Sequence, residues 1–116
     1  MEKQITITMS ERKARALYDI TLVTIEELDE LYKKNHQPRT KQSRDDLKEI
    51  IEDLRKQTNK VTITMTERKA RTLFDNTLVK IWALDKLHEE DRSPATKQSA
   101  NDLEEIIEDL RKRIYS

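Results

Sequence analysis

Two short segments alternate polar and apolar residues and could expose a row of hydrogen-bonding side chains. They are residues 4–9 and residues 60–65. Successive side chains of an extended strand point to opposite faces, so the polar residues of each segment share one face. These polar residues are Gln4, Thr6 and Thr8 in the first segment and Lys60, Thr62 and Thr64 in the second. Their amide, hydroxyl and ammonium groups can bind a polar partner, or they form a solvated surface, since Thr favours strands.

The apolar residues of the same segments indicate how the polar ones are positioned. They are Ile5, Ile7 and Met9 in the first segment and Val61, Ile63 and Met65 in the second. A lone strand leaves its backbone N–H and C=O groups unpaired on both edges. No other segment alternates as clearly, so we expect the two segments to pair as a ribbon with the apolar face inward.

The chain repeats itself. Residues 5–56 align without a gap with residues 61–112 at a constant offset of 56, and 33 of the 52 pairs are identical. This similarity predicts an internal duplication. We expect a first unit, residues 1–57, and a second unit, residues 58–116, which share one core within one chain or with a second chain.

Each predicted strand is followed by apolar residues at the helical spacing of three and four. They are Ala14, Leu17, Tyr18, Leu22, Ile25, Leu28 and Leu31, and then Ala70, Leu73, Phe74, Leu78, Ile81, Leu84 and Leu87. Ser10 and Thr66 are suitable N-caps. The β-branched residues within 20–25 leave a break or a strand open, but the absence of Gly and Pro favours one helix to about Lys34.

Pro38 and Pro94 predict the end of each long helix, because a proline disfavours helical geometry in the residue before it. Thr40 or Ser43 could cap the helix that follows, and Ser43 with Asp46 has a spacing like that of a capping box. Its apolar stripe is Leu47, Ile50, Ile51 and Leu54, repeated as Leu103, Ile106, Ile107 and Leu110. The predicted fold is mainly α with a short two-stranded β-ribbon, built as a duplicated β-α-α unit.

Composition argues against several classes of function. The chain has no Gly, so it cannot form the Gly-dependent loops that bind phosphates or dinucleotides. It has no Cys, and His36 and His88 lie at unmatched positions of the repeat. We therefore expect no enzyme, no catalytic residues, and no metal, cofactor or small-molecule substrate. The lack of a long apolar run predicts no signal peptide and no membrane partner, and the lack of Cys fits a cytoplasmic protein.

An alternating strand followed by two helices, used as a pair, resembles the ribbon-helix-helix DNA-binding family in its duplicated form. The resemblance implies that the strands pair antiparallel and that the ribbon enters the major groove of double-stranded DNA. Gln4, Thr6, Thr8, Lys60, Thr62 and Thr64 would then contact the bases. The implied function is that of a transcriptional repressor, or of an accessory factor in plasmid or phage DNA processing.

The resemblance also implies contacts with the DNA phosphates. The start of the second helix in each unit, at Gln42-Ser43 and Gln98-Ser99, matches the place where the family binds a phosphate. Basic residues follow each strand, namely Arg12, Lys13, Arg68 and Lys69. Positive charge at a helix N-terminus opposes the helix dipole, so these residues indicate either an external anion or an ordinary solvated helix face.

Two alternatives remain open from the sequence. The three residues 57–59 span only about 10 Å when extended, so the strands pair either within one chain or between two chains of a homodimer. Trp82-Ala83 replaces Glu26-Glu27 of the first unit. This apolar pair either fills a gap in the fold or marks a protein interface. An interface there would favour a helical protein-interaction module, a phage or plasmid adaptor or inhibitor, with no DNA contact.

Overall fold

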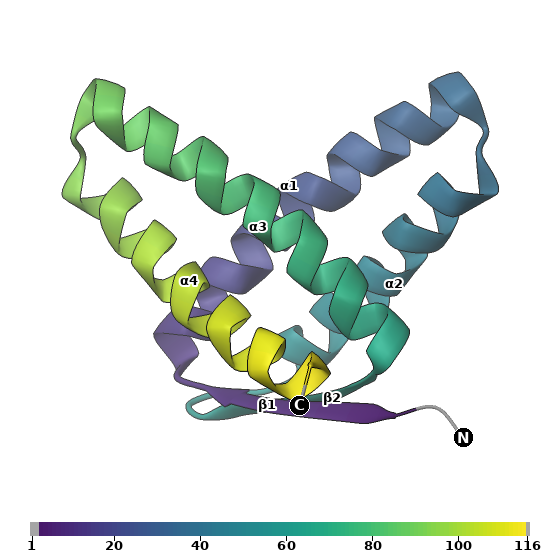
Figure 1. The fold of residues 1–116 in the computed structure, drawn as a ribbon, viewed down its shortest axis with the longest axis horizontal. Coiled ribbons are helices and arrows are strands. Elements are labelled where there is room, and N and C mark those ends of the chain that lie inside the picture. The colour runs from purple at the N-terminus through teal and green to yellow at the C-terminus, as the bar shows by residue number, and fades with distance from the viewer. Residues whose placement is uncertain (1–2, 116) are drawn as a thin grey trace.

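The order of elements in the computed structural model is strand-helix-helix, twice. The structure describes residues 3–115, apart from the side chain of Asp91. The elements are β1 (Gln4–Met9), α1 (Glu11–Asn35), α2 (Pro38–Arg55), β2 (Val61–Thr66), α3 (Glu67–Asp91) and α4 (Pro94–Ile114). Figure 1 shows two helical hairpins, α1–α2 and α3–α4, that diverge from a ribbon at their base. The prediction of a mainly helical fold with a two-stranded antiparallel ribbon is confirmed.

The ribbon forms within one chain. Strands β1 and β2 pair antiparallel, with Ile7 opposite Ile63 at the centre and Thr6 opposite Thr64 beside it. Of the two alternatives left open by the sequence, the structure shows pairing within one chain. The length of the linker does not limit the pairing, because the linker joins α2 to β2, whereas α1 and α2 carry the chain away from β1 and back to the ribbon.

The first helix of each unit starts where a hydroxyl cap was predicted. The side chains of Ser10 and Thr66 accept hydrogen bonds from the backbone N–H of Lys13 and Lys69. Helix α1 then runs without a break through its β-branched residues, so the prediction of one long helix is confirmed. Within that run, the Thr24 hydroxyl donates to the carbonyl of Ile20 at 2.9 Å, which satisfies a buried polar group inside the helix.

The second helices start earlier than predicted. Pro38 is the first residue of α2, and Gln37 before it is extended, as expected of a residue preceding proline. Thr40 and Ser43 therefore lie inside α2 and do not cap it, so that prediction was wrong. The N1 position suits proline because its fixed φ is helical and it has no N–H to leave unpaired.

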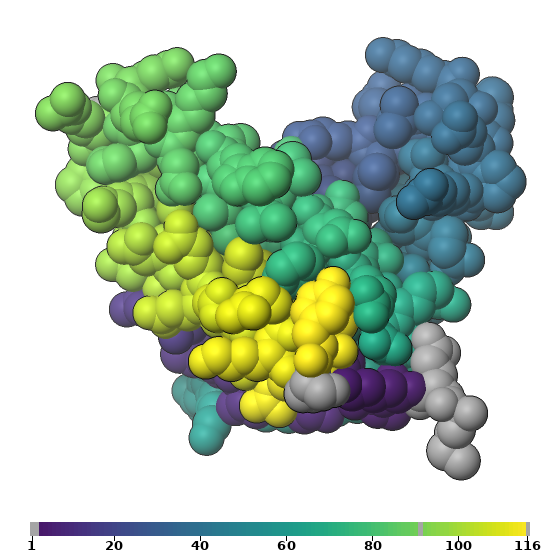
Figure 2. Space-filling view, viewed as in Figure 1, coloured from purple at the N-terminus to yellow at the C-terminus, as the bar shows by residue number. Residues whose placement is uncertain are grey.

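The apolar face of the ribbon and the inner faces of the helices form one core cluster, to which both units contribute. Fully buried members include Ile7, Leu17, Leu47, Leu73 and Leu103. Figure 2 shows that the surface is hollowed between the diverging arms. The predicted apolar stripe is partly exposed at Leu22, Leu31 and Leu87. Leu31 and Leu87 belong to the last part of α1 and α3, where the two helices diverge (Figure 1).

The first arm is fastened by a contact that the second arm lacks. Arg44 of α2 donates to Asp29 of α1 (Nη1–Oδ1 2.7 Å) and lies 5.4 Å from the centre of the Tyr32 ring. The hydrogen bond from Arg44 lowers the pKa of Asp29 below its ordinary value. The second unit has Ala100 at the position of Arg44.

Replacing Arg44 with Ala is therefore expected to raise the pKa of Asp29 toward its ordinary value of about 3.9, as measured by NMR titration of the carboxyl carbons. Since the folded pKa lies below the unfolded one, the pair stabilises the fold above the unfolded pKa, and this contribution is lost as the pH falls through the folded pKa. The variant should thus be less stable than the wild type at neutral pH and approach it in acid. An unchanged Asp29 titration would contradict this assignment.

Candidate nucleic-acid interface

The polar face of the ribbon is a continuous exposed surface at the end of the molecule opposite the arm tips, and the helices of residues 3–115 lie on the other side of the ribbon (Figure 1). Its centre is a square of four threonines. The hydroxyls of Thr6 and Thr64 lie 2.9 Å apart, and those of Thr8 and Thr62 lie 3.0 Å apart. Each hydroxyl has one proton to donate, so each pair uses one proton internally and keeps the other for an outside acceptor.

The ends of this face carry the longer side chains. Gln4 is exposed in β1, opposite Thr66. Lys60 is also exposed, but it lies just before β2, in a turn in which Asn59 adopts a positive φ of 65°. The structure therefore brings Gln4, the four threonines and Lys60 to one end of the molecule, with Lys60 outside the paired register.

Gln57 fixes the outer edge of β2, a role that the sequence did not suggest. Its side-chain amide accepts from the backbone N–H of Thr62 at 2.9 Å and donates to the carbonyl of Thr62 at 2.6 Å. These two hydrogen bonds imitate a neighbouring strand and satisfy both backbone groups of Thr62. Gln57 thus holds the backbone of a threonine whose side chain lies at the centre of the polar face.

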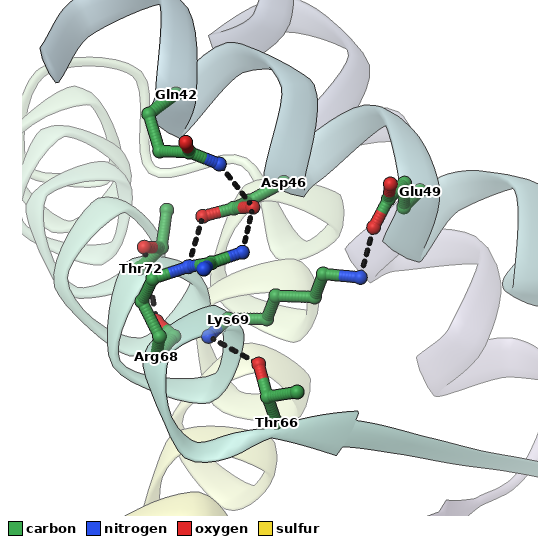
Figure 3. A network of polar contacts seen from close by, with 7 residues as sticks. All are labelled: Gln42, Asp46, Glu49, Thr66, Arg68, Lys69 and Thr72. Carbon is green, nitrogen blue, oxygen red and sulfur yellow. Dashed lines mark hydrogen bonds and ion pairs between the residues drawn. The ribbon is translucent and has the colours of Figure 1, made fainter. Parts of the chain in front are cut away.

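The basic residues after each strand have partners inside the chain. Arg12 of α1 makes a two-point contact with Asp102 of α4 (Nε–Oδ2 3.1 Å, Nη2–Oδ1 2.9 Å). Arg68 of α3 contacts Asp46 of α2 in the same way (Nε–Oδ2 3.3 Å, Nη2–Oδ1 3.0 Å), as Figure 3 shows. Both carboxylates are almost completely buried, with 4% and 3% of their side chains exposed. Each arginine therefore neutralises a buried charge of the other unit.

The two lysines follow the same pattern at the rim of these contacts. Lys13 pairs with Glu105 of α4, and Lys69 pairs with Glu49 of α2. The positive charge at the start of α1 and α3, which opposes the helix dipoles, is thus balanced by carboxylates within the protein. The guanidinium groups nevertheless remain accessible, because the side chains of Arg12 and Arg68 are 66% and 54% exposed.

The predicted phosphate site at the second helices does not have the expected geometry. Gln42 and Ser43 lie in the second turn of α2, and Gln98 and Ser99 lie at the same place in α4, because both helices begin at the preceding proline. Their backbone N–H groups are inside the helix, and free N–H groups occur only in the first turn. That first turn lies at the arm tips, away from the ribbon (Figure 1).

The side chains of these glutamines are also engaged. Gln42 donates to Asp46 at 3.0 Å, and Gln98 donates to Asp102 at 3.0 Å. Each buried carboxylate therefore accepts hydrogen bonds from one glutamine and one arginine, and Figure 3 shows this for Asp46. Sequence reasoning missed these aspartates as structural partners. A signal was available, because the arginine, glutamine and aspartate of each contact are identical in both units. Polar residues on a solvated surface would be expected to vary more between the copies.

The structure also places the candidate interface residues. Trp82 of α3 is 62% exposed and Ala83 is exposed as well, so the alternative that Trp82 fills a gap in the fold was wrong. Among the side chains that the structure describes, no group of His, Asp and Glu is arranged to hold a metal ion. None of the helices in this part of the chain has the length and apolarity that a bilayer crossing requires.

Comparison with known proteins gives no family assignment for the chain. A scan against protein-family profiles found no match, and searches of curated proteins and of solved structures found none either.

Proposed function

We propose that this chain binds double-stranded DNA by inserting its β-ribbon into the major groove, as a duplicated relative of the ribbon-helix-helix proteins. The observation that carries the proposal is the register of the ribbon. It aligns the polar residues of β1 and β2 into one exposed surface with unused hydrogen-bonding groups at its centre. A transcriptional repressor and an accessory factor of DNA processing would both use such a surface.

The dimensions of the ribbon suit the groove. Six paired residues at about 3.4 Å each give a ribbon roughly 20 Å long, with strands about 4.8 Å apart. The major groove is about 12 Å wide and admits a two-stranded ribbon. A threonine hydroxyl can donate to or accept from a base edge, and its methyl group can contact thymine. Gln4 and Lys60 at the ends extend the surface toward adenine and guanine edges.

Arg12 supports the proposal in a modified role. It uses Nε and Nη2 on the buried Asp102, and a guanidinium carries five N–H donors in a planar fork. A phosphate could therefore bind the outer edge of the same group. The buried carboxylate would hold the guanidinium in place for that contact, at the cost of part of its charge.

Titration of labelled duplex DNA, measured by fluorescence polarisation, tests the proposal. A pool of random duplexes, selected by several rounds of binding, would supply the preferred sequence. We expect binding to weaken as salt is raised from 50 to 200 mM. If about four phosphates are contacted, the slope of log K against log salt should be roughly −4. A lack of binding at 50 mM salt, or binding without sequence preference after selection, would contradict the proposal.

The exposed Trp82 favours a second candidate function, a helical protein-interaction module that does not contact DNA. A formal net charge of zero is also more usual for such a module than for a DNA-binding protein. The DNA titration separates the two candidates, because the second one requires that no duplex binds at any salt concentration.

A further inference from the structure

The exposed faces of α1 and α3 differ more than their origin in a repeat would suggest. On α1 the exposed stripe is Val23, Glu26 and Glu30, which we call the α1 face. On α3 the equivalent stripe is Val79, Trp82 and Lys86, which we call the α3 face. The valines, exposed by 45% and 56%, are retained in both units, whereas the acidic residues of one face are replaced by an aromatic and a basic residue on the other.

We propose that the α3 face of one copy of this chain docks on the α1 face of a second copy. Residues three and four positions apart lie on one side of a helix, so each face presents its three residues together. The apolar parts of Val23, Val79 and Trp82 would be buried in the contact. Lys86 would meet the carboxylates of Glu26 and Glu30, which gives the two faces complementary charge.

Charge pairing between these helices already occurs inside the molecule. Lys80 of α3 forms an ion pair with Glu27 of α1 where the two helices cross. The acidic part of α1 therefore accepts a lysine from α3 within the chain. The α1 face lies next to that contact in sequence and carries further carboxylates. In the proposed contact, a second copy would place another lysine of α3, Lys86, against this α1 face.

The arrangement predicts the kind of assembly. Figure 1 shows α3 crossing in front of α1, and the faces on these two helices carry different residues, so they are unlike surfaces. A contact between unlike surfaces is heterologous and leaves one free face of each kind at the ends of the assembly. The contact is small, and interfaces of that size are weak and transient. We therefore expect reversible chains of copies that form only at high concentration.

Sedimentation equilibrium of the full chain, without DNA, measures this association. The average mass should rise with concentration between 5 and 300 µM and fall again when salt is added. Trp82 is the only tryptophan in the chain, so its emission should shift to shorter wavelength over the same range as it is buried. A mass that stays monomeric up to 300 µM would overturn the proposal, whether or not the chain binds DNA.

Two variants identify the faces. Glu26→Lys/Glu30→Lys destroys the α1 face and retains the α3 face, and Trp82→Glu/Lys86→Glu does the reverse. Each variant alone should remain monomeric, because every contact needs one face of each kind. Their mixture should associate, because the first variant retains the α3 face and the second retains the α1 face. Since only the first variant contains tryptophan, titration with the second should shift its emission directly.

The control is Asp53→Lys/Glu104→Lys, at exposed positions of α2 and α4, which adds the same positive charge outside both faces and should associate as the wild type does. Circular dichroism must show the same helix content for all variants. A mixture of the two face variants that stays monomeric, or a Trp82→Glu/Lys86→Glu variant that associates alone, would overturn the proposal.

Discussion

Replacing Thr6 and Thr62 together with Ala is expected to reduce the preference of the chain for its selected DNA site over random duplex by roughly 30-fold. The two substitutions together remove one hydroxyl from each threonine pair of the polar face. Each removed hydroxyl takes with it one contact to a base edge, as donor or acceptor, and two such contacts at about 1 kcal/mol each correspond to this factor. The measurement is the ratio of dissociation constants for selected and random duplexes at a fixed salt concentration. The salt dependence should not change, because phosphate contacts remain.

Thr72→Ala is the matched control for this experiment. Thr72 lies on α3 away from the ribbon, where its hydroxyl donates to the carbonyl of Arg68, and the first unit has Ala16 at the same position. This variant should bind selected and random duplexes as the wild type does. A double variant at Thr6 and Thr62 with an unchanged ratio would rule out the ribbon as the surface that reads sequence.

Replacing Arg68 with Ala is expected to lower the free energy of unfolding by about 2–3 kcal/mol. The substitution leaves the carboxylate of Asp46, which is 3% exposed, with only the hydrogen bond from Gln42. A buried charge without a counterion costs several kcal/mol, and water that enters beside the truncated side chain would recover part of this. The expected fall in melting temperature is roughly 10 °C, measured by thermal unfolding followed by circular dichroism.

A double variant separates the charge from the lost packing. Arg68→Ala/Asp46→Asn should be more stable than Arg68→Ala by about 1 kcal/mol, because a neutral amide needs no counterion. Arg39→Ala is a suitable control, since Arg39 is exposed and the second unit has Ala95 at that position. It should change stability by less than about 0.5 kcal/mol. Equal stability of Arg68→Ala and the wild type would show that the buried carboxylate does not depend on this arginine.

The sequence was sufficient to predict the elements whose local signals agree with their tertiary context. Alternation in residues 4–9, a hydroxyl cap at Ser10 and the apolar spacing that follows all indicated a strand and then a helix, and both are present. The β-branched residues within 20–25 were ambiguous because their intrinsic preference opposes the helix. Burial of Thr21, Thr24 and Ile25 against the rest of the core decides the matter in favour of the helix.

The polar contacts between the units could not be predicted from local signals. A capping pattern at Ser43 and Asp46 and a proline at residue 38 both indicate a helix start, and the proline determines it. Asp46 was therefore assigned to a cap, although its actual partner, Arg68, is 22 residues away. The basic residues after each strand suggested an external anion because their carboxylate partners are also distant in the sequence. Only the packing of α3 against α2 shows that their first partners are carboxylates of this chain.

The exchange of charged partners between the units has a consequence for any attempt to divide the protein. In a fragment that ends before β2, β1 would lack its partner strand. Asp46 would lack Arg68, the arginine that contacts it in the whole chain. Such a fragment could complete its interior only by joining a second polypeptide. The turn at residues 56–60 makes the association of the two halves intramolecular, and a short tether gives them an effective concentration of about the millimolar range. Cleavage there would turn a folding reaction that is independent of protein concentration into one that depends on it.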